Sequence, residues 1–134
     1  MSKGHRILYV EDNPANLALV TKVLEHAGGY VVVGVTTGEE ALERVPRERP
    51  DLLLLDLDLP GIDGFEVARR IKRDPKLAEL PIIAISASVM KQERRQALEA
   101  GCLAFIEKPF DIDALRRLVA EAIAGTVNPR DSQF

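Results

Sequence analysis

Asp56 is the residue whose type and setting point most directly to chemistry. It follows four consecutive leucines, Leu52–Leu55, a run typical of a strand buried on both faces of a parallel sheet. Pro60 and Gly61 just beyond it indicate a loop. A carboxylate at the carboxyl end of such a strand stands where open α/β sheets bind ligands, although a lone aspartate there can also simply cap a turn.

Further polar residues follow other predicted strands, namely Glu11, Asp12, Ser86 and Lys108. The carboxyl ends of parallel strands lie along one edge of a sheet, so we expect these side chains to converge on Asp56. Carboxylates about 4–6 Å apart repel one another by roughly 1 kcal/mol or more per pair, so the cluster requires a counter-charge. Lys108 and a divalent cation can supply it.

The predicted ligands are oxygens, which favours Mg²⁺ over Zn²⁺, because neither Cys102 nor the histidines His5 and His26 fall at a strand end. A carboxylate beside Mg²⁺, a lysine and a hydroxyl is the set of groups that phosphoryl transfer needs. Each residue alone has an ordinary alternative, such as helix capping by an acid or a solvated lysine. Their combination predicts an aspartyl phosphate on Asp56.

The elements that position these residues alternate along the chain. Short apolar or β-branched runs predict strands over residues 6–10, 30–35, 52–55, 82–85 and 102–106. Helical spacing and capping residues predict helices over 14–27, 38–45, 64–73, 91–100 and 111–124, with capping boxes at Thr37/Glu40 and Asp63/Glu66. This (βα)₅ pattern predicts an α/β fold, a doubly wound five-stranded parallel sheet with helices on both faces.

Length and composition are consistent with one domain. The chain has 134 residues, of which 46% are hydrophobic, and its net charge of −3 gives no broad electrostatic surface for nucleic acid or a membrane. A single cysteine, Cys102, cannot form an internal disulfide, and we expect it to be a small buried apolar residue. No apolar run is long enough for a signal peptide or a membrane span, so we expect a cytoplasmic protein. Residues 1–124 are predicted to form the domain and 125–134 a flexible tail.

With Glu11-Asp12, Asp56 before LxLPGxDG, Ser86 and Lys108-Pro109 at these spacings, the sequence resembles the receiver domain of two-component response regulators over residues 6–124. The resemblance implies the flavodoxin-like strand order 2-1-3-4-5. It also implies that Asp56 accepts a phosphoryl group from a histidine kinase or a histidine phosphotransfer protein. The chain would then be no enzyme in the usual sense, since it would catalyse only its own phosphorylation and dephosphorylation.

The resemblance also implies the metal ligands. Asp12 and Asp56 would bind Mg²⁺ directly, Glu11 would bind it through water, and Asp58 would contribute its main-chain carbonyl. The side chains of Asp58 and Ser88 would tune how fast water removes the phosphoryl group.

The switch is likewise implied by the family pattern. Ser86 would be the hydroxyl that turns toward the phosphate, Lys108 would pair with it, and Phe105 would change rotamer along with Ser86. The Lys108-Pro109 peptide bond would be cis. Phe105 has no hydroxyl, so an output that relies on a tyrosine hydroxyl at this position is placed in doubt.

The output surface is expected on the face formed by residues 91–100, 102–106 and 111–124, where a downstream effector protein would bind and homodimers can form. Phe105, Lys91, Arg94 and Arg95 form the expected contact region, and these charges alone would be interpreted simply as a solvated helix face.

Alternative functions belong to other classes. Asp56-Leu-Asp58 also resembles the DxD motif of haloacid-dehalogenase-type phosphatases, in which the first aspartate is the nucleophile and the second a general acid. That family carries its motif on the first core strand, whereas here an acidic pair precedes Asp56. A docking scaffold that is never phosphorylated is the other alternative, and the complete set of site residues argues against it.

Overall fold

The computed structural model of the chain describes residues 4–87, 90–109 and 111–126, with the side chains of residues 27 and 28 left aside. Within these ranges the chain forms five strands and five helices that alternate without exception. The strands are β1 (Arg6–Val10), β2 (Val31–Val35), β3 (Leu52–Asp56), β4 (Ile82–Ser86) and β5 (Ala104–Glu107). The helices are α1 (Pro14–Gly28), α2 (Gly38–Glu48), α3 (Gly64–Arg73), α4 (Lys91–Glu99) and α5 (Ile112–Ala124).

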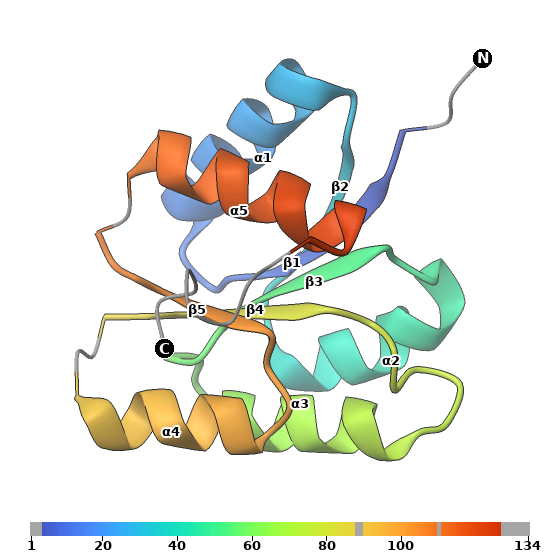
Figure 1. The fold of residues 1–134 in the computed structure, drawn as a ribbon, viewed down its shortest axis with the longest axis vertical. Helices are drawn as coiled ribbons and strands as arrows, with labels where there is room; N and C mark the ends of the chain where they lie inside the picture. Colours follow the sequence, from blue (N-terminus) through green and yellow to red (C-terminus); the bar gives the residue numbers. More distant parts are fainter. Residues whose placement is uncertain (1–3, 88–89, 110, 127–134) are drawn as a thin grey trace.

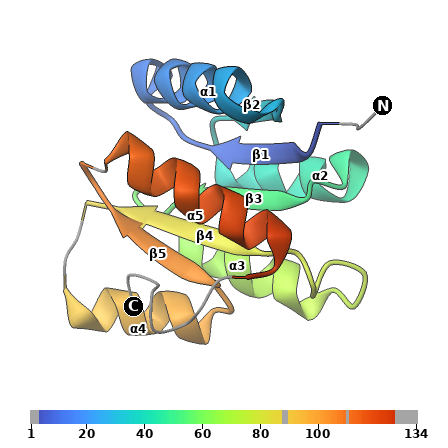
Figure 2. The same ribbon diagram turned by 45° about the horizontal axis from the view of Figure 1, so that its top comes forward.

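The strands form one parallel sheet in the order β2-β1-β3-β4-β5, as predicted. Helices α1 and α5 cover one face of this sheet, while α2, α3 and α4 cover the other (Figures 1 and 2). Each face has its own core of buried apolar side chains. The predicted doubly wound α/β architecture is therefore confirmed.

The central strand β3 explains why a run of leucines precedes Asp56. All of its residues are buried, because β1 and β4 pair with its two edges and helices cover both of its faces. Leu53 and Leu55 point toward the α2–α4 layer, and Leu52 and Leu54 point toward α1 and α5. The side chains alternate between the faces, so a strand covered on both faces must be apolar at every position.

Helix α1 begins and ends at the residues that local chemistry favours. The Asn13 side chain accepts hydrogen bonds from the main-chain N–H groups of Ala15 and Asn16, and Pro14 occupies the first turn, where its missing N–H costs nothing. Gly29 ends the helix with φ 70°, a left-handed conformation that favours glycine. The Asn13 cap adjoins the loop that carries Glu11 and Asp12 and fixes where the helix begins after it.

Helix α2 is longer than the sequence predicted. We expected it to end at Val45 because Pro46 follows, yet it continues to Glu48 and includes the proline. Val45 is buried in the core, which holds this last turn against the sheet. The Arg49 N–H donates to the Val45 carbonyl in a left-handed cap with φ 46°, so the helix ends there instead.

Other boundaries differ from the predictions by a few residues. Strand β2 begins at Val31 rather than at residue 30, and β5 begins at Ala104 rather than at Cys102. Both predicted capping boxes are half formed among the described residues. Thr37 accepts from the Glu40 N–H and Asp63 accepts from the Phe65 N–H, but the acids bond elsewhere. Glu40 accepts from the Thr36 N–H, and Glu66 pairs with arginines on its own helix.

The lengths and hydropathy of the helices show whether any of them could cross a membrane. Among the described residues, no helix combines the length and the apolar character needed to cross a bilayer. Ser88 and residues 127–134 of the predicted tail lie outside the described residues, and the domain boundary at residue 124 stays a prediction.

Candidate functional site

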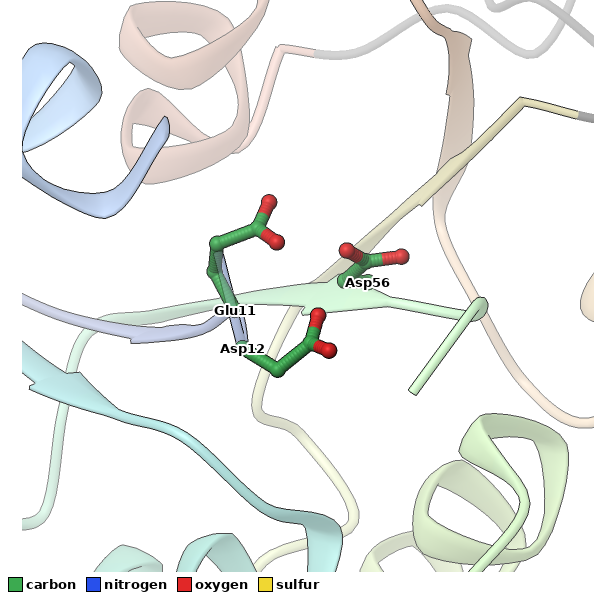
Figure 3. A group of neighbouring side chains, drawn as sticks. All are labelled: Glu11, Asp12 and Asp56. Carbon is green, nitrogen blue, oxygen red and sulfur yellow. The ribbon is translucent and has the colours of Figure 1, made fainter. Parts of the chain in front are cut away.

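The Asp56 carboxylate lies at the carboxyl end of β3, at the centre of the edge where the strands end (Figure 3). Its side chain is fully buried, and both of its oxygens are engaged. Oδ2 lies 2.6 Å from the Lys108 Nζ, and Oδ1 accepts a 2.8 Å hydrogen bond from the Asp58 N–H. Strand, lysine and loop therefore hold this carboxylate in a single orientation.

Glu11 and Asp12 follow β1, the neighbour of β3, and bring their carboxylates to Asp56 (Figure 3). One oxygen of each of the three residues lies within 4.8 Å of the others. Glu11 and Asp56 are buried, whereas Asp12 is exposed. Oxygen-only donors with one side open to water fit Mg²⁺, which keeps several of its waters when bound to protein. The structure thus brings together the acids that the sequence predicted to converge.

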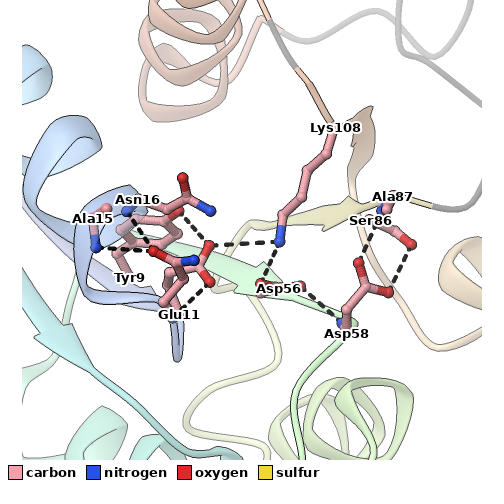
Figure 4. A network of polar contacts seen from close by, with 10 residues as sticks. Tyr9, Glu11, Ala15, Asn16, Asp56, Asp58, Ser86, Ala87 and Lys108 are labelled. Carbon is pink, nitrogen blue, oxygen red and sulfur yellow. Dashed lines mark hydrogen bonds and ion pairs between the residues drawn. The ribbon is translucent and has the colours of Figure 1, made fainter.

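Lys108, the residue after β5, supplies the counter-charge. Its Nζ lies 2.6 Å from Asp56 Oδ2 and 3.6 Å from Glu11 Oε1 (Figure 4). Burial alone would lower the pKa of this ammonium, but the hydrogen bond and charge of Asp56, together with the charge of Glu11, outweigh burial and raise the pKa. The Lys108-Pro109 peptide bond is cis, as the resemblance implied.

The surroundings of Asp56 act on its pKa in opposite directions. The pKa of Asp56 is raised to about 6, because burial, aided by the negative charge of Glu11, outweighs the hydrogen bonds from Lys108 and from the Asp58 N–H, which lower it. A carboxylate in this setting is stabilised by any cation that enters the site.

Tyr9 completes the acidic cluster, and sequence reasoning did not identify it. Its hydroxyl donates a 3.0 Å hydrogen bond to Glu11 Oε1 (Figure 4). The Asn13 N–H donates to Glu11 Oε2 at 3.1 Å. The ring is fully buried, and burial together with the charge of Glu11 raises the pKa of Tyr9, so the phenol stays a donor. The available signal was the spacing, because residues two apart on a strand share a face.

The Asp58 side chain lies on the other side of Asp56. Its carboxylate accepts a 3.2 Å hydrogen bond from Ser86 Oγ and a 2.9 Å hydrogen bond from the Ala87 N–H (Figure 4). Ser86 is fully buried at the end of β4, whereas Asp58 is exposed. The structure therefore brings Ser86 to the site edge through Asp58, a contact that the sequence did not predict.

Phe105 lies fully buried on β5, among the side chains beneath α2, α3 and α4. The Arg94 guanidinium of α4 stands 5.6 Å from the centre of its ring and pairs with Glu107 at 3.3 Å. The interpretation of Arg94 as part of a plain solvated face is therefore wrong, because this side chain covers Phe105. Cys102 is buried as expected, and burial raises the pKa of its thiol to about 12.

This fold and this cluster of acids, lysine and serine define a class that comparison with known proteins identifies. The family model of the response regulator receiver domain matches residues 7–120. The chain belongs to the response regulator receiver domain family.

Relatives support this assignment. The polar-differentiation response regulator DivK of Brucella anthropi is 38% identical over 106 residues, which are 79% of this chain and 85% of the relative. The receiver domain of a sensor histidine kinase from Pseudomonas aeruginosa, solved with a magnesium ion in its active-site cleft, is similar with a TM-score of 0.83 and 35% identity, covering 90% of this chain and 98% of that chain. The phosphorylated cyanobacterial phytochrome response regulator RcpA has a TM-score of 0.79 and 31% identity, covering 93% and 97%.

Proposed function

We propose that this chain is a signalling switch in which Asp56 accepts a phosphoryl group from a phosphohistidine of a histidine kinase or a histidine phosphotransfer protein. The observation that carries the proposal is the buried Asp56 carboxylate, held 2.6 Å from Lys108 and within 4.8 Å of an oxygen of Glu11 and of Asp12. A carboxylate nucleophile among fixed cations and cation ligands is the arrangement that phosphoryl transfer needs.

In the proposed step, a carboxylate oxygen of Asp56 attacks phosphorus while the bond from phosphorus to the histidine nitrogen breaks. The nitrogen keeps the electron pair, and because the other ring nitrogen of the phosphohistidine carries a proton, the leaving group is neutral imidazole and the charge balances. Glu11, Asp12, Asp56 and the Asp58 carbonyl would hold Mg²⁺, which supplies charge neutralisation at the phosphoryl oxygens. Lys108 stays beside the carboxylate and offsets the charge that Asp56 gains. Hydrolysis of the acyl phosphate by water returns Asp56 to its free form.

The output would follow from the added charge of about −1.5 to −2. Ser86 would turn toward the phosphoryl group, and Phe105 would change rotamer beneath Arg94. The face formed by α4, β5 and α5 would then alter its affinity for a downstream effector or for a second copy of the chain.

The test is phosphorylation by acetyl phosphate with Mg²⁺, followed by intact-protein mass spectrometry. We expect a mass gain of one phosphoryl group per chain, and none after Asp56→Asn. Asp63→Asn is the matched control, because Asp63 caps α3 at the surface and asparagine caps equally well, so its phosphorylation should be unchanged.

Two further assays, of phosphomonoester turnover and of partner binding, separate the alternatives. Many turnovers on a phosphomonoester, abolished by Asp58→Asn, would favour a haloacid-dehalogenase-type phosphatase. If acetyl phosphate added nothing to the wild-type chain and Asp56→Asn bound partners as wild type does, the docking scaffold would replace the switch.

A further inference from the structure

Asp58 connects the strand that carries the phosphoryl acceptor to the strand that carries the switch hydroxyl. Its main-chain N–H donates to Asp56 Oδ1 at 2.8 Å, while its carboxylate accepts from Ser86 Oγ at 3.2 Å and from the Ala87 N–H at 2.9 Å. Figure 4 shows the Asp58 side chain turned away from the acidic cluster and toward the end of β4.

The two donors to the Asp58 carboxylate, the Ser86 hydroxyl and the Ala87 N–H, cannot make a full hydrogen bond to a second acceptor at the same time. A serine hydroxyl and a main-chain amide each have a single proton to donate. While Ser86 and Ala87 donate to the Asp58 carboxylate, these protons are engaged and are not available to an anion attached to Asp56. The Asp58 carboxylate is itself an anion with two acceptor oxygens, so it resembles a phosphoryl group as a hydrogen-bond acceptor.

We propose that the Asp58 carboxylate is an internal competitor of the phosphoryl group for the Ser86 hydroxyl and the Ala87 N–H, and that it holds the end of β4 in its resting arrangement. This inference rests on the proposed phosphorylation of Asp56. It gives Asp58 a side-chain role in setting the switch equilibrium, distinct from any main-chain contribution to a metal site.

The competition also explains how phosphorylation releases the contact. A phosphoryl group on Asp56 places about −1.5 to −2 of charge two residues from Asp58, and like charges repel. The same group offers oxygens that can take over both donors. Release of the donors by Asp58 and their capture by the phosphoryl group therefore act in the same direction, which sharpens the switch.

The size of the effect follows from the fraction of chains in the released arrangement. If only that arrangement binds a phosphoryl mimic, the apparent affinity equals the intrinsic affinity multiplied by the fraction of chains in the released arrangement. Asp58 is exposed, so water competes for its carboxylate and the contact is of modest strength. We expect its removal to tighten binding of a phosphoryl mimic about threefold to tenfold.

The test uses the full chain with Mg²⁺ and beryllofluoride, followed by ¹⁵N NMR of the Ala87 amide. Compared with wild type, Asp58→Ala should bind beryllofluoride about threefold to tenfold more tightly, and Asp58→Asn should fall between them because an amide keeps one acceptor oxygen. In the unliganded chain, Asp58→Ala should also speed hydrogen exchange of the Ala87 amide. Equal affinities for wild type and Asp58→Ala would overturn the proposal.

A second comparison separates competition from the mere loss of a negative charge near an anion site. In the Ser86→Ala background the hydroxyl is absent, so Asp58→Ala should gain less than about threefold if Asp58 competes for that hydroxyl. The same gain in both backgrounds, diminished by added salt, would identify a through-space charge effect and would contradict the proposal.

The outcomes also distinguish this inference from the proposed function. A wild-type chain that takes no phosphoryl group on Asp56 and binds no beryllofluoride would overturn both. A wild-type chain that does both, with Asp58→Ala indistinguishable from it, would overturn the role of Asp58 alone.

Discussion

Asp56 is buried beside a second buried acid, and this raises its pKa to about 6. The raised pKa means that the folded chain holds the proton on Asp56 more tightly than the unfolded chain does. The stability that this contributes is present at low pH and is lost as the pH rises through about 6. At neutral pH the charged carboxylate therefore lowers the free energy of unfolding.

We predict that Asp56→Asn raises the free energy of unfolding by about 1–3 kcal/mol at pH 7.5 without divalent cations, because the neutral amide removes the cost of the buried charge. The gain should shrink as the pH falls below 6, where Asp56 in the wild-type chain takes up its own proton. Urea unfolding at pH 7.5 and pH 4.5, in the presence of a chelator, measures both effects.

Asp63→Asn provides the matched control, since it makes the same chemical change at the cap of α3. Its effect should stay within about 0.5 kcal/mol at either pH. A gain for Asp56→Asn that is the same at both pH values would show that burial of the charge is not its source.

Single residues could be predicted from sequence where position in a strand determines their surroundings. Asp56, Glu11 and Lys108 follow predicted strands, and parallel strands share one edge, so their meeting followed from the pattern. The contact between Tyr9 and Glu11 was missed because a tyrosine within a strand is ordinarily core. The contact between Asp58 and Ser86 depends on loop rotamers, which strand patterns do not determine.

Arg94 connects helix α4 to β5 in two ways. The Arg94 guanidinium lies over the ring of Phe105 and also pairs with Glu107, with 29% of its side chain exposed. Ala97 is the only buried residue in the described helix α4, so apolar contact between this helix and the sheet is limited. Arg94 therefore compensates for a helix with little apolar surface.

We predict that Arg94→Met lowers the free energy of unfolding by about 1 kcal/mol, because methionine keeps apolar contact but loses the ion pair and the contact between cation and ring. Urea denaturation measures this difference. Relative to wild type, the variant should also show a larger increase in amide exchange along α4 than along α3. Arg95→Met is the control, because Arg95 is exposed on the same helix and should change stability by less than about 0.5 kcal/mol. Equal losses for the two variants would exclude a special role for Arg94.

The sequence correctly predicted each of the five strands and five helices but misplaced some of the residues at which they begin or end. Pro46 marked an expected end of α2 since proline lacks the N–H that a helix needs. Packing of Val45 against the core outweighed that loss. Glu66 was expected to cap its own helix but is engaged by Arg69 and Arg70 one turn later, a competition between neighbours that a local motif cannot resolve.

For the molecule as a whole, the acidic edge is a site where ligand binding and folding are linked. A cation that binds the folded chain and not the unfolded chain stabilises it by about 1.4 kcal/mol at ten times its dissociation constant. We predict that Mg²⁺ at that concentration raises the melting temperature by about 4–6 °C. Differential scanning calorimetry, with and without a chelator, measures the shift.

Asp12→Asn should abolish most of this shift without harming the fold, since Asp12 is exposed and contributes one of the clustered oxygens. Asp113→Asn, an exposed acid at the start of α5, should leave the shift intact. A Mg²⁺ shift that survives in Asp12→Asn would place the cation somewhere other than this cluster.

The overall architecture was predictable because alternating strands and helices of crossover length allow few arrangements. The pattern gave a parallel sheet with helices on both faces. It did not give the strand order, since an apolar run shows that a strand is buried but not which strands lie beside it. The order 2-1-3-4-5 came from the resemblance to a known family and is what the structure has.

The hydrogen bond from Tyr9 to Glu11 has a consequence for observing this protein without any label. The chain contains two tyrosines and no tryptophan, so phenol groups dominate its near-ultraviolet absorption and emission. One of those phenols, fully buried, ends on a carboxylate of the acidic cluster. The Tyr9 phenol is therefore an optical reporter that is hydrogen-bonded to the acidic cluster, and it can be followed in the intrinsic spectrum of the unmodified protein.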